Sequence, residues 1–210
     1  MLKFPNNQKY LVFDGETCHL NLCLPDNKTW EWAWLEYQGE EIVSKADYYI
    51  KWPNLNISKE AALMTHFNPL NIQEKGVDPK MVIEKLDNFI YNTEYMLIAA
   101  NGLRFDIYLH NIHRRLVGLP TDYSYIDRVI DPVALARGIK TGVTKDNNTS
   151  LYEHQLKVSS IRQKGLKTSV RQLCQDYGIP YDETQAHNAL WDVETLWKIW
   201  LKMKAQLENE

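Results

Sequence analysis

The feature that most constrains the fold is an apolar segment, residues 9–17 (KYLVFDGET), that ends in two acids. Its apolar run predicts a short, buried central strand. Because side chains alternate along a strand, Asp14 and Glu16 share one face, and Gly15 between them leaves the backbone uncrowded. A packed interior does not tolerate several converging carboxylates without cations. The pair therefore indicates a site for divalent metal at the end of this strand.

A third acid, Asp106, follows a second apolar strand. Residues 95–100 (YMLIAA) lead into NGLRFD, and apolar residues then repeat with helical spacing as far as Leu116. Asp106 falls in the first turn of that predicted helix, where the helix dipole favours a carboxylate by ~0.3–1 kcal/mol. Considered alone, Asp106 is better explained as a helix-start acid.

The last helical pattern, residues 187–204, carries a histidine and a fourth acid. At ~100° per residue, Asp192 lies about 60° from the centre of the apolar stripe, so its carboxylate can reach inward. His187 is about 140° around the helix from Asp192, which places it in the preceding loop or the first turn. An exposed, movable histidine suits a general base. On its own, His187 is better explained as an ordinary surface histidine at a helix start.

The remaining patterns predict one α/β domain with a mixed five-stranded sheet flanked by helices. Residues 29–52 alternate around a turn at 38–40 and predict a hairpin next to the first strand. Residues 138–165 lack a sustained period and predict a long, functional or mobile loop. Further predicted elements are helices at 59–64, 79–92, 105–116, 132–137, 169–178 and 187–204, and strands at 95–100 and within 124–131. The domain spans residues 1–210, with a core of about 8–203.

Composition narrows the functional class. The chain has 210 residues, 44% of them hydrophobic, and a net charge of −3, which argues against a wholly basic nucleic-acid coat protein. Residues 137–171 nevertheless hold eight basic and two acidic residues, so this segment carries +6 and the remainder −9. The three cysteines lack the spacing of zinc or redox motifs. No apolar run approaches the ~18 residues of a membrane span. We therefore expect a cytoplasmic protein.

The three motifs, in the order D-x-E, N-x-x-R-F-D and A-H-x-A-x-x-D, resemble the DEDDh (DnaQ-like) branch of the 3′ to 5′ exonuclease superfamily. The resemblance covers about residues 8 to 203 and implies a ribonuclease H-like fold. It implies that Asp14, Glu16, Asp106 and Asp192 hold two divalent ions, Mg²⁺ or Mn²⁺, and that His187 activates the attacking water. The implied reaction releases nucleoside 5′-monophosphates from the 3′ end of single-stranded nucleic acid.

Other residues are candidates for substrate binding. Thr17 follows the first acid pair, where the family contacts the terminal sugar, and Asn101 and Arg104 belong to the middle motif. Arg104 could contact a phosphate or pair with a nearby acid. Three further candidates belong to the basic segment, which serves either as a phosphate channel or as a solvated surface: Arg162, Lys164 and Lys167.

Two questions stay open at this stage. The substrate is a 3′ end of DNA or RNA, and the motif residues do not decide between the two, because recognition of the 2′-OH depends on pocket shape. DNA is favoured, with an oligoribonuclease-like role on short RNA as the alternative. A catalytically silent nucleic-acid-binding or polymerase-associated module is the other class. The presence of all five motif residues favours an enzyme. A polymerase or other replication partner is left open.

Overall fold

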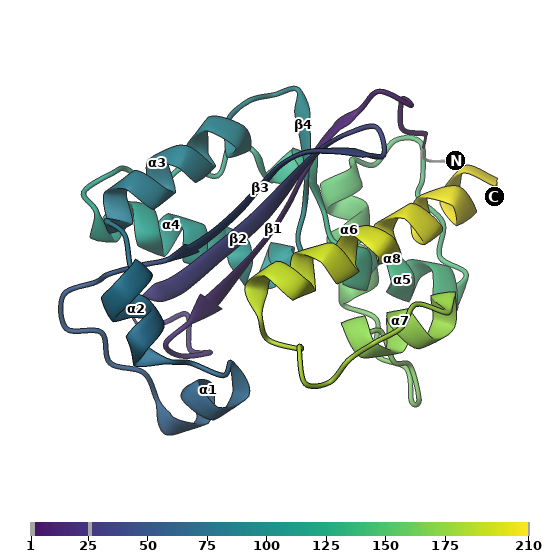
Figure 1. Ribbon diagram of the computed structural model, residues 1–210. Coiled ribbons are helices and arrows are strands. Elements are labelled where there is room, and N and C mark those ends of the chain that lie inside the picture. The colour runs from purple at the N-terminus through teal and green to yellow at the C-terminus, as the bar shows by residue number, and fades with distance from the viewer. Residues whose placement is uncertain (1–2, 25–26, 210) are drawn as a thin grey trace.

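The computed structural model describes residues 3–24 and 27–209. Its centre is a five-stranded sheet with the strand order β3-β2-β1-β4-β5 (Figure 1). β1 is antiparallel to β2 and parallel to β4, which confirms the predicted mixed sheet. The strands are β1 (Lys9–Thr17), β2 (Thr29–Gln38), β3 (Glu41–Tyr49), β4 (Tyr95–Ile98) and β5 (Val129–Ile130).

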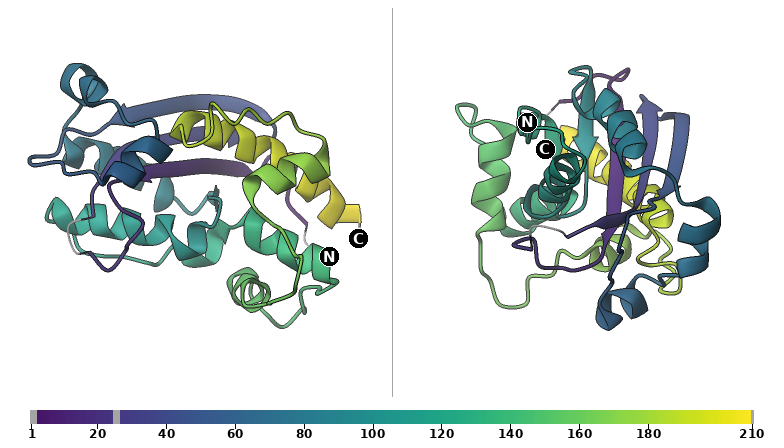
Figure 2. Two further views of the ribbon diagram at one scale, coloured as in Figure 1. Left: turned by 90° about the horizontal axis from the view of Figure 1, so that it is seen from below. Right: turned by 90° about the vertical axis from the view of Figure 1, so that its left-hand side faces the viewer.

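Helices cover both faces of the sheet (Figures 1 and 2). One hydrophobic cluster joins the sheet to α3 and α4, and another joins it to α5, α7 and α8. The helices are α1 (Lys59–Met64), α2 (Pro69–Lys75), α3 (Pro79–Ile90), α4 (Asp106–Leu116), α5 (Pro132–Thr141), α6 (Leu151–Ser159), α7 (Val170–Tyr177) and α8 (Ala189–Asn209), with 3₁₀ turns η1 (Gly102–Arg104) and η2 (Ile126–Arg128). α1 and α2 lie beyond the end of the sheet at which β1 finishes.

The central strand β1 shows why the acid pair is interrupted by glycine. Tyr10 and Val12 pack in the same cluster as α8, and the two acids continue that face of the strand. On the opposite face the indole of Trp32 lies against Gly15, where an added Cβ would come within 2.6 Å of the ring. Glycine is therefore required for the close packing of β1 on Trp32.

The prediction of a structureless loop over residues 138–165 was wrong. α5 continues to Thr141, and α6 forms after a capping box in which Ser150 and Glu153 each accept from the other's backbone amide. The buried side of α6 is largely polar, so its apolar period is weak. Gln155 donates to the Val129 carbonyl at 2.8 Å and accepts from the Asp131 amide at 2.7 Å. Its amide thus completes the hydrogen bonding of the edge strand β5.

The other predicted helices and strands agree with the structure to within a few residues at their ends, and one helix was missed. Ser58 and Asp78 cap α1 and α3 as expected. α2 was not predicted, although Asn68 caps it and a proline opens it. In the described residues, no helix combines the length and the apolar composition needed to cross a membrane.

Candidate active site

The acid pair of β1 points into a pocket of about 500 Å³ at the end of the sheet where β1 and β4 finish. Glu16 is 7% exposed, and Asp14 is partly exposed on the wall of the pocket. All five motif residues line this pocket: Asp14, Glu16, Asp106, His187 and Asp192. Residues from three distant parts of the sequence therefore converge as the motifs predicted.

Asp106 reaches the pocket through a tight turn after β4. Asn101 adopts a left-handed conformation (φ 57°), η1 follows, and α4 begins at Asp106. The carboxylate is 2% exposed and hydrogen-bonds the amides of Gly15 and of its own residue. Its Oδ1 has no hydrogen-bond partner in the described part of the chain. A buried carboxylate oxygen without a donor is costly, so a cation would stabilise this arrangement.

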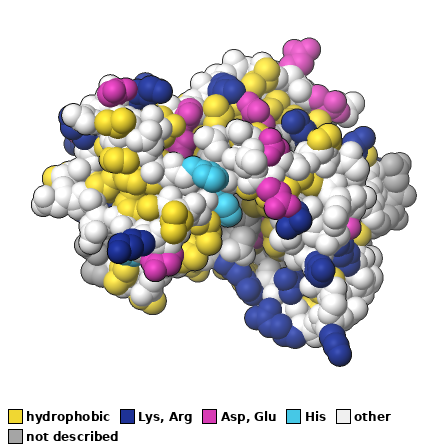
Figure 3. Space-filling view, turned by 60° about the horizontal axis from the view of Figure 1, so that its bottom comes forward, with side chains coloured by type: hydrophobic (Ala, Val, Ile, Leu, Met, Phe, Trp, Pro, Cys, Tyr) yellow, Lys and Arg dark blue, Asp and Glu magenta, His cyan; other side chains and the backbone are white. Residues whose placement is uncertain are grey.

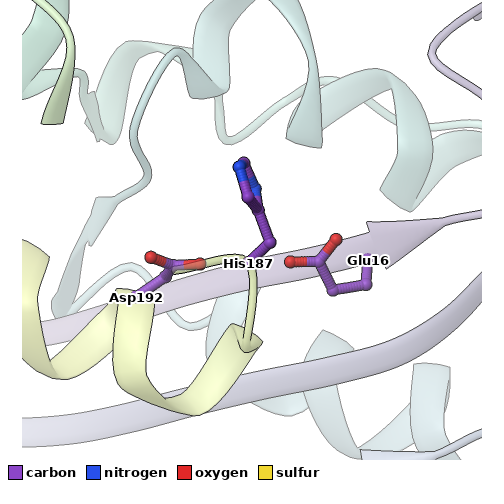
Figure 4. Close-up of side chains that lie close together, drawn as sticks. All are labelled: Glu16, His187 and Asp192. Carbon is purple, nitrogen blue, oxygen red and sulfur yellow. The ribbon is translucent and has the colours of Figure 1, made fainter. Parts of the chain in front are cut away.

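The start of α8 supplies the remaining two side chains. Asn188 caps the helix by accepting from the Trp191 amide at 3.0 Å. His187 precedes it in a left-handed conformation (φ 65°), exposed and outside the helix, as its register predicted. In Figure 4 the His187 side chain projects from the chain between Glu16 and Asp192, with its imidazole above their two carboxylates. The ligand atoms of the three residues lie within 4.8 Å of one another.

The electrostatics of the pocket favour bound cations. Burial raises the pKa of each of the four motif carboxyl groups, and repulsion by Asp14 raises the pKa of the other three further. The pKa of His187 is lowered, first by partial loss of solvent around the ring and then by His66 nearby. At neutral pH the imidazole is therefore neutral, with one nitrogen able to accept a proton.

One acid near the site was missed from the sequence. Glu31 on β2 lies directly opposite Glu16 on β1 and is 1% exposed. Burial raises its pKa, and Asp47 on β3 raises it further. The alternating tryptophans of β2 predict which face of the strand is buried in the apolar core. They say nothing about the opposite face, on which Glu31 lies. Pairing β2 against β1 in register would have brought Glu31 beside the acid pair.

The predicted substrate-binding residues divide into two groups. Thr17 and Asn101 line the pocket, and the Thr17 hydroxyl donates to Asn27 at 2.6 Å. Arg104 does not line it, and its guanidinium donates to the Ser159 carbonyl at 3.1 Å.

The basic segment also lies outside the pocket lining. Arg162, Lys164 and Lys167 are exposed in the connection between α6 and α7. In Figure 3, Lys and Arg side chains gather on one side of the face shown, with histidine side chains nearer its middle. Substrate binding by these three residues and by Arg104 stays a prediction.

Comparisons with known proteins identify the fold. No protein-family model and no curated protein sequence matches the chain. Among solved structures, it is similar to a zinc-bound complex of E. coli exonuclease I with single-stranded DNA, at a TM-score of 0.75 and 15% identity over 96% of this chain and 41% of that one. The chain has the ribonuclease H-like fold of exonuclease I. The fold implied by the motifs is thereby confirmed.

Other exonuclease I structures give the same result. A complex of the E. coli enzyme with a dA16 oligonucleotide matches at a TM-score of 0.75 and 15% identity, over 96% of this chain and 42% of that one. A structure of exonuclease I described as suggesting how processivity is achieved matches at a TM-score of 0.73 and 17% identity. The match covers 94% of this chain and 41% of that one. The chain therefore spans less than half the length of these exonuclease I chains. At such low identity the similarity establishes the fold and not the reaction.

Proposed function

We propose that this chain is a metal-dependent 3′ to 5′ exonuclease that acts on single-stranded DNA in the cytoplasm and releases nucleoside 5′-monophosphates. The observation that carries the proposal is the convergence of four carboxylates and His187 on one pocket of an exonuclease I fold. DNA is favoured over RNA because the similar exonuclease I structures include complexes with DNA oligonucleotides.

The residues present fit divalent cations. Carboxylate oxygens are the hard ligands that Mg²⁺ and Mn²⁺ prefer. The Oδ1 of Asp106 is buried and receives no hydrogen bond from the residues that the structure describes, which supports a cation there. We assign the binding of two ions to Asp14, Glu16, Asp106 and Asp192. When bound, such ions offset the repulsion among the acids, polarise the phosphodiester and lower the pKa of a water.

His187 is proposed as the general base. A nitrogen of its neutral imidazole takes a proton from the attacking water, and the hydroxide adds to the phosphorus between the last two nucleotides. The bond from phosphorus to the 3′ oxygen of the penultimate nucleotide then breaks, and that oxygen is protonated by solvent. Thr17 and Asn101, which line the pocket, are proposed to contact the terminal nucleotide.

Labelled single strands test the proposal. Single-stranded DNA and RNA, each carrying either a 3′ or a 5′ label, are incubated with Mg²⁺ or Mn²⁺. Early loss of the 3′ label, together with a descending ladder from the 5′ label, is expected for DNA. Faster trimming of RNA would instead identify an oligoribonuclease-like enzyme. Binding without any product would identify a catalytically silent module.

A rise in pH is expected to lower the stability of the metal-free protein, and bound metal is expected to raise it. Groups whose folded pKa is raised favour the folded state at low pH, and this stability is lost as pH rises through the folded pKa. The melting temperature of the metal-free protein should therefore fall between about pH 5 and pH 8. Mn²⁺ at about 100 times its Kd should add ~2.7 kcal/mol and raise the melting temperature by about 5–10 °C at pH 8. Calorimetry with EDTA or Mn²⁺ measures both effects, and a melting temperature indifferent to Mn²⁺ would contradict the metal assignment.

Neutralising the basic segment is expected to weaken DNA binding. Replacement of Arg162, Lys164 and Lys167 by glutamine should flatten the dependence of log K on log salt by about 2, since each lost contact to a single strand contributes about 0.7. Anisotropy titrations of labelled DNA in EDTA at several salt concentrations measure the slope. An unchanged slope would remove these residues from the binding surface.

A further inference from the structure

A second hollow lies outside the catalytic pocket. It has a volume of about 460 Å³ and is bounded by the residues that follow β3, the start of α3 and the end of α4. Its apolar lining includes Trp52, Pro79 and Leu116, and three lysines surround this lining: Lys28, Lys51 and Lys80. Among the described residues, Asp78 is the one acid that lines it, and its side chain is occupied in capping α3. The hollow therefore combines an apolar floor with a positively charged rim.

The floor of this hollow is rigid. Trp52 is 8% exposed, its indole N–H donates to the Thr29 carbonyl at 2.7 Å, and its ring centre lies 4.7 Å from that of His113. His113 in turn contacts the Pro79 carbonyl at 2.8 Å through Nε2. A ring held in this way offers a fixed apolar surface to a ligand without loss of side-chain entropy.

The lysines of the rim retain donors for an anion. The Lys28 ammonium donates to the carbonyls of Pro53 and Asn54 at 3.1 and 3.2 Å, which uses two of its three N–H groups. Lys80 faces Glu84 at 3.8 Å, with both side chains exposed, and such pairs contribute little. Lys51 is exposed. An anionic ligand would therefore meet three cations that no strong ion pair from the described part of the chain neutralises.

The hollow is joined to the catalytic pocket through one backbone connection. The Lys28 carbonyl accepts from the Cys18 amide at 3.0 Å and from the Thr17 hydroxyl at 3.3 Å. Thr17 lines the catalytic pocket, whereas the Lys28 side chain lines the second hollow. The two sites thus lie at the same end of the sheet, one beside the end of β1 and the other beside the start of β2.

We propose that this hollow, at Lys28, Lys51, Lys80 and Trp52, binds an internal segment of the single strand whose 3′ end occupies the catalytic pocket. A single strand presents phosphates and apolar base faces in alternation, which matches a lysine rim over an apolar floor. A chain with a net charge of −3 repels polynucleotides overall, so its local basic sites decide where a strand can lie. The inference rests on the proposed function for the position of the 3′ end.

The test separates binding from hydrolysis. The variant Lys51→Gln/Lys80→Gln changes only exposed side chains, so the fold should be retained. Anisotropy of a DNA strand of about 15 nucleotides, the upper range covered by one single-strand-binding fold, is measured in EDTA. Loss of two phosphate contacts should raise Kd by about 10- to 30-fold near 0.1 M salt and flatten the salt slope by about 1.4. With Mn²⁺, hydrolysis of a dinucleotide should be unchanged, because it is too short to reach the hollow.

The matched control is Lys198→Gln/Lys202→Gln, which removes two exposed lysines of α8. This control should leave Kd and the salt slope unaltered. Equal effects of the two double variants, or an unchanged Kd in Lys51→Gln/Lys80→Gln, would overturn the second site. Lysine-dependent binding without hydrolysis of any strand would overturn the proposed exonuclease function and leave the second site standing.

Discussion

Replacement of Asp14 by asparagine is expected to abolish hydrolysis and, at the same time, to stabilise the metal-free protein. Asp14 raises the pKa of Glu16, Asp106 and Asp192, so it is the carboxylate that repels the other three. An amide cannot supply the charge that holds a divalent ion. We therefore expect the rate of 3′ end release to fall by at least about 10³-fold. This is as large as, or larger than, the fall in kcat when one preorganised hydrogen-bond donor to a transition state is removed.

The stability gain in Asp14→Asn should depend on pH. The folded pKa of Asp14 is raised, so the cost of its ionisation is absent at low pH and grows as pH rises through the folded pKa. At pH 8 the melting temperature of the variant should exceed that of the wild type by about 2–4 °C for each kcal/mol of repulsion removed. The difference should vanish near pH 4. Calorimetry in EDTA at the two pH values measures it.

The exposed acid Asp127 provides the control for this experiment. Asp127→Asn should hydrolyse DNA at the wild-type rate and melt with the wild type at both pH values. If Asp14→Asn retains substantial activity, or melts below the wild type at pH 8, Asp14 does not have the role proposed for it.

The elements that position the site could be predicted because their signals are local. β1 is a short apolar run whose period places both acids on one face, and the hairpin of β2 and β3 alternates around a turn. The left-handed conformation of His187 could not be seen in the sequence, but its register relative to Asp192 already placed it in the loop or first turn before the last helix. Period and register thus sufficed for the arrangement of these side chains.

What escaped prediction depends on contacts between distant segments. Gln155 on α6 is buried because its side chain hydrogen-bonds backbone groups at the edge strand β5. The sequence of residues 151–159 alone does not show that these backbone groups lack other partners in the sheet. Glu31 becomes part of the site's electrostatics only when β2 pairs with β1. Arg104 stands two residues before Asp106, yet the turn at η1 directs it to the Ser159 carbonyl. In each case the partner is chosen by tertiary packing.

The second large effect is expected for His187→Ala, and it distinguishes a general base from a metal ligand. Loss of a general base typically lowers kcat by about 10²–10⁴-fold. His187 also lies within 4.8 Å of Glu16 and Asp192, measured between ligand atoms, so geometry alone would allow it to bind the ion. If it is the base, the Mn²⁺ concentration that gives half-maximal activity should be unchanged while kcat falls. Metal titrations of the residual activity measure both quantities.

The matched control for His187→Ala is His19→Ala, which removes a second histidine that lines the same pocket. We expect this control to retain at least about a tenth of the wild-type kcat, since no proton transfer is assigned to it. A shift of the Mn²⁺ requirement in His187→Ala would make His187 a metal ligand. A loss of kcat smaller than about tenfold would instead assign proton abstraction to another group. Because the imidazole is exposed and lies outside α8, we expect neither outcome: the four acids hold the ions, and the histidine moves the proton.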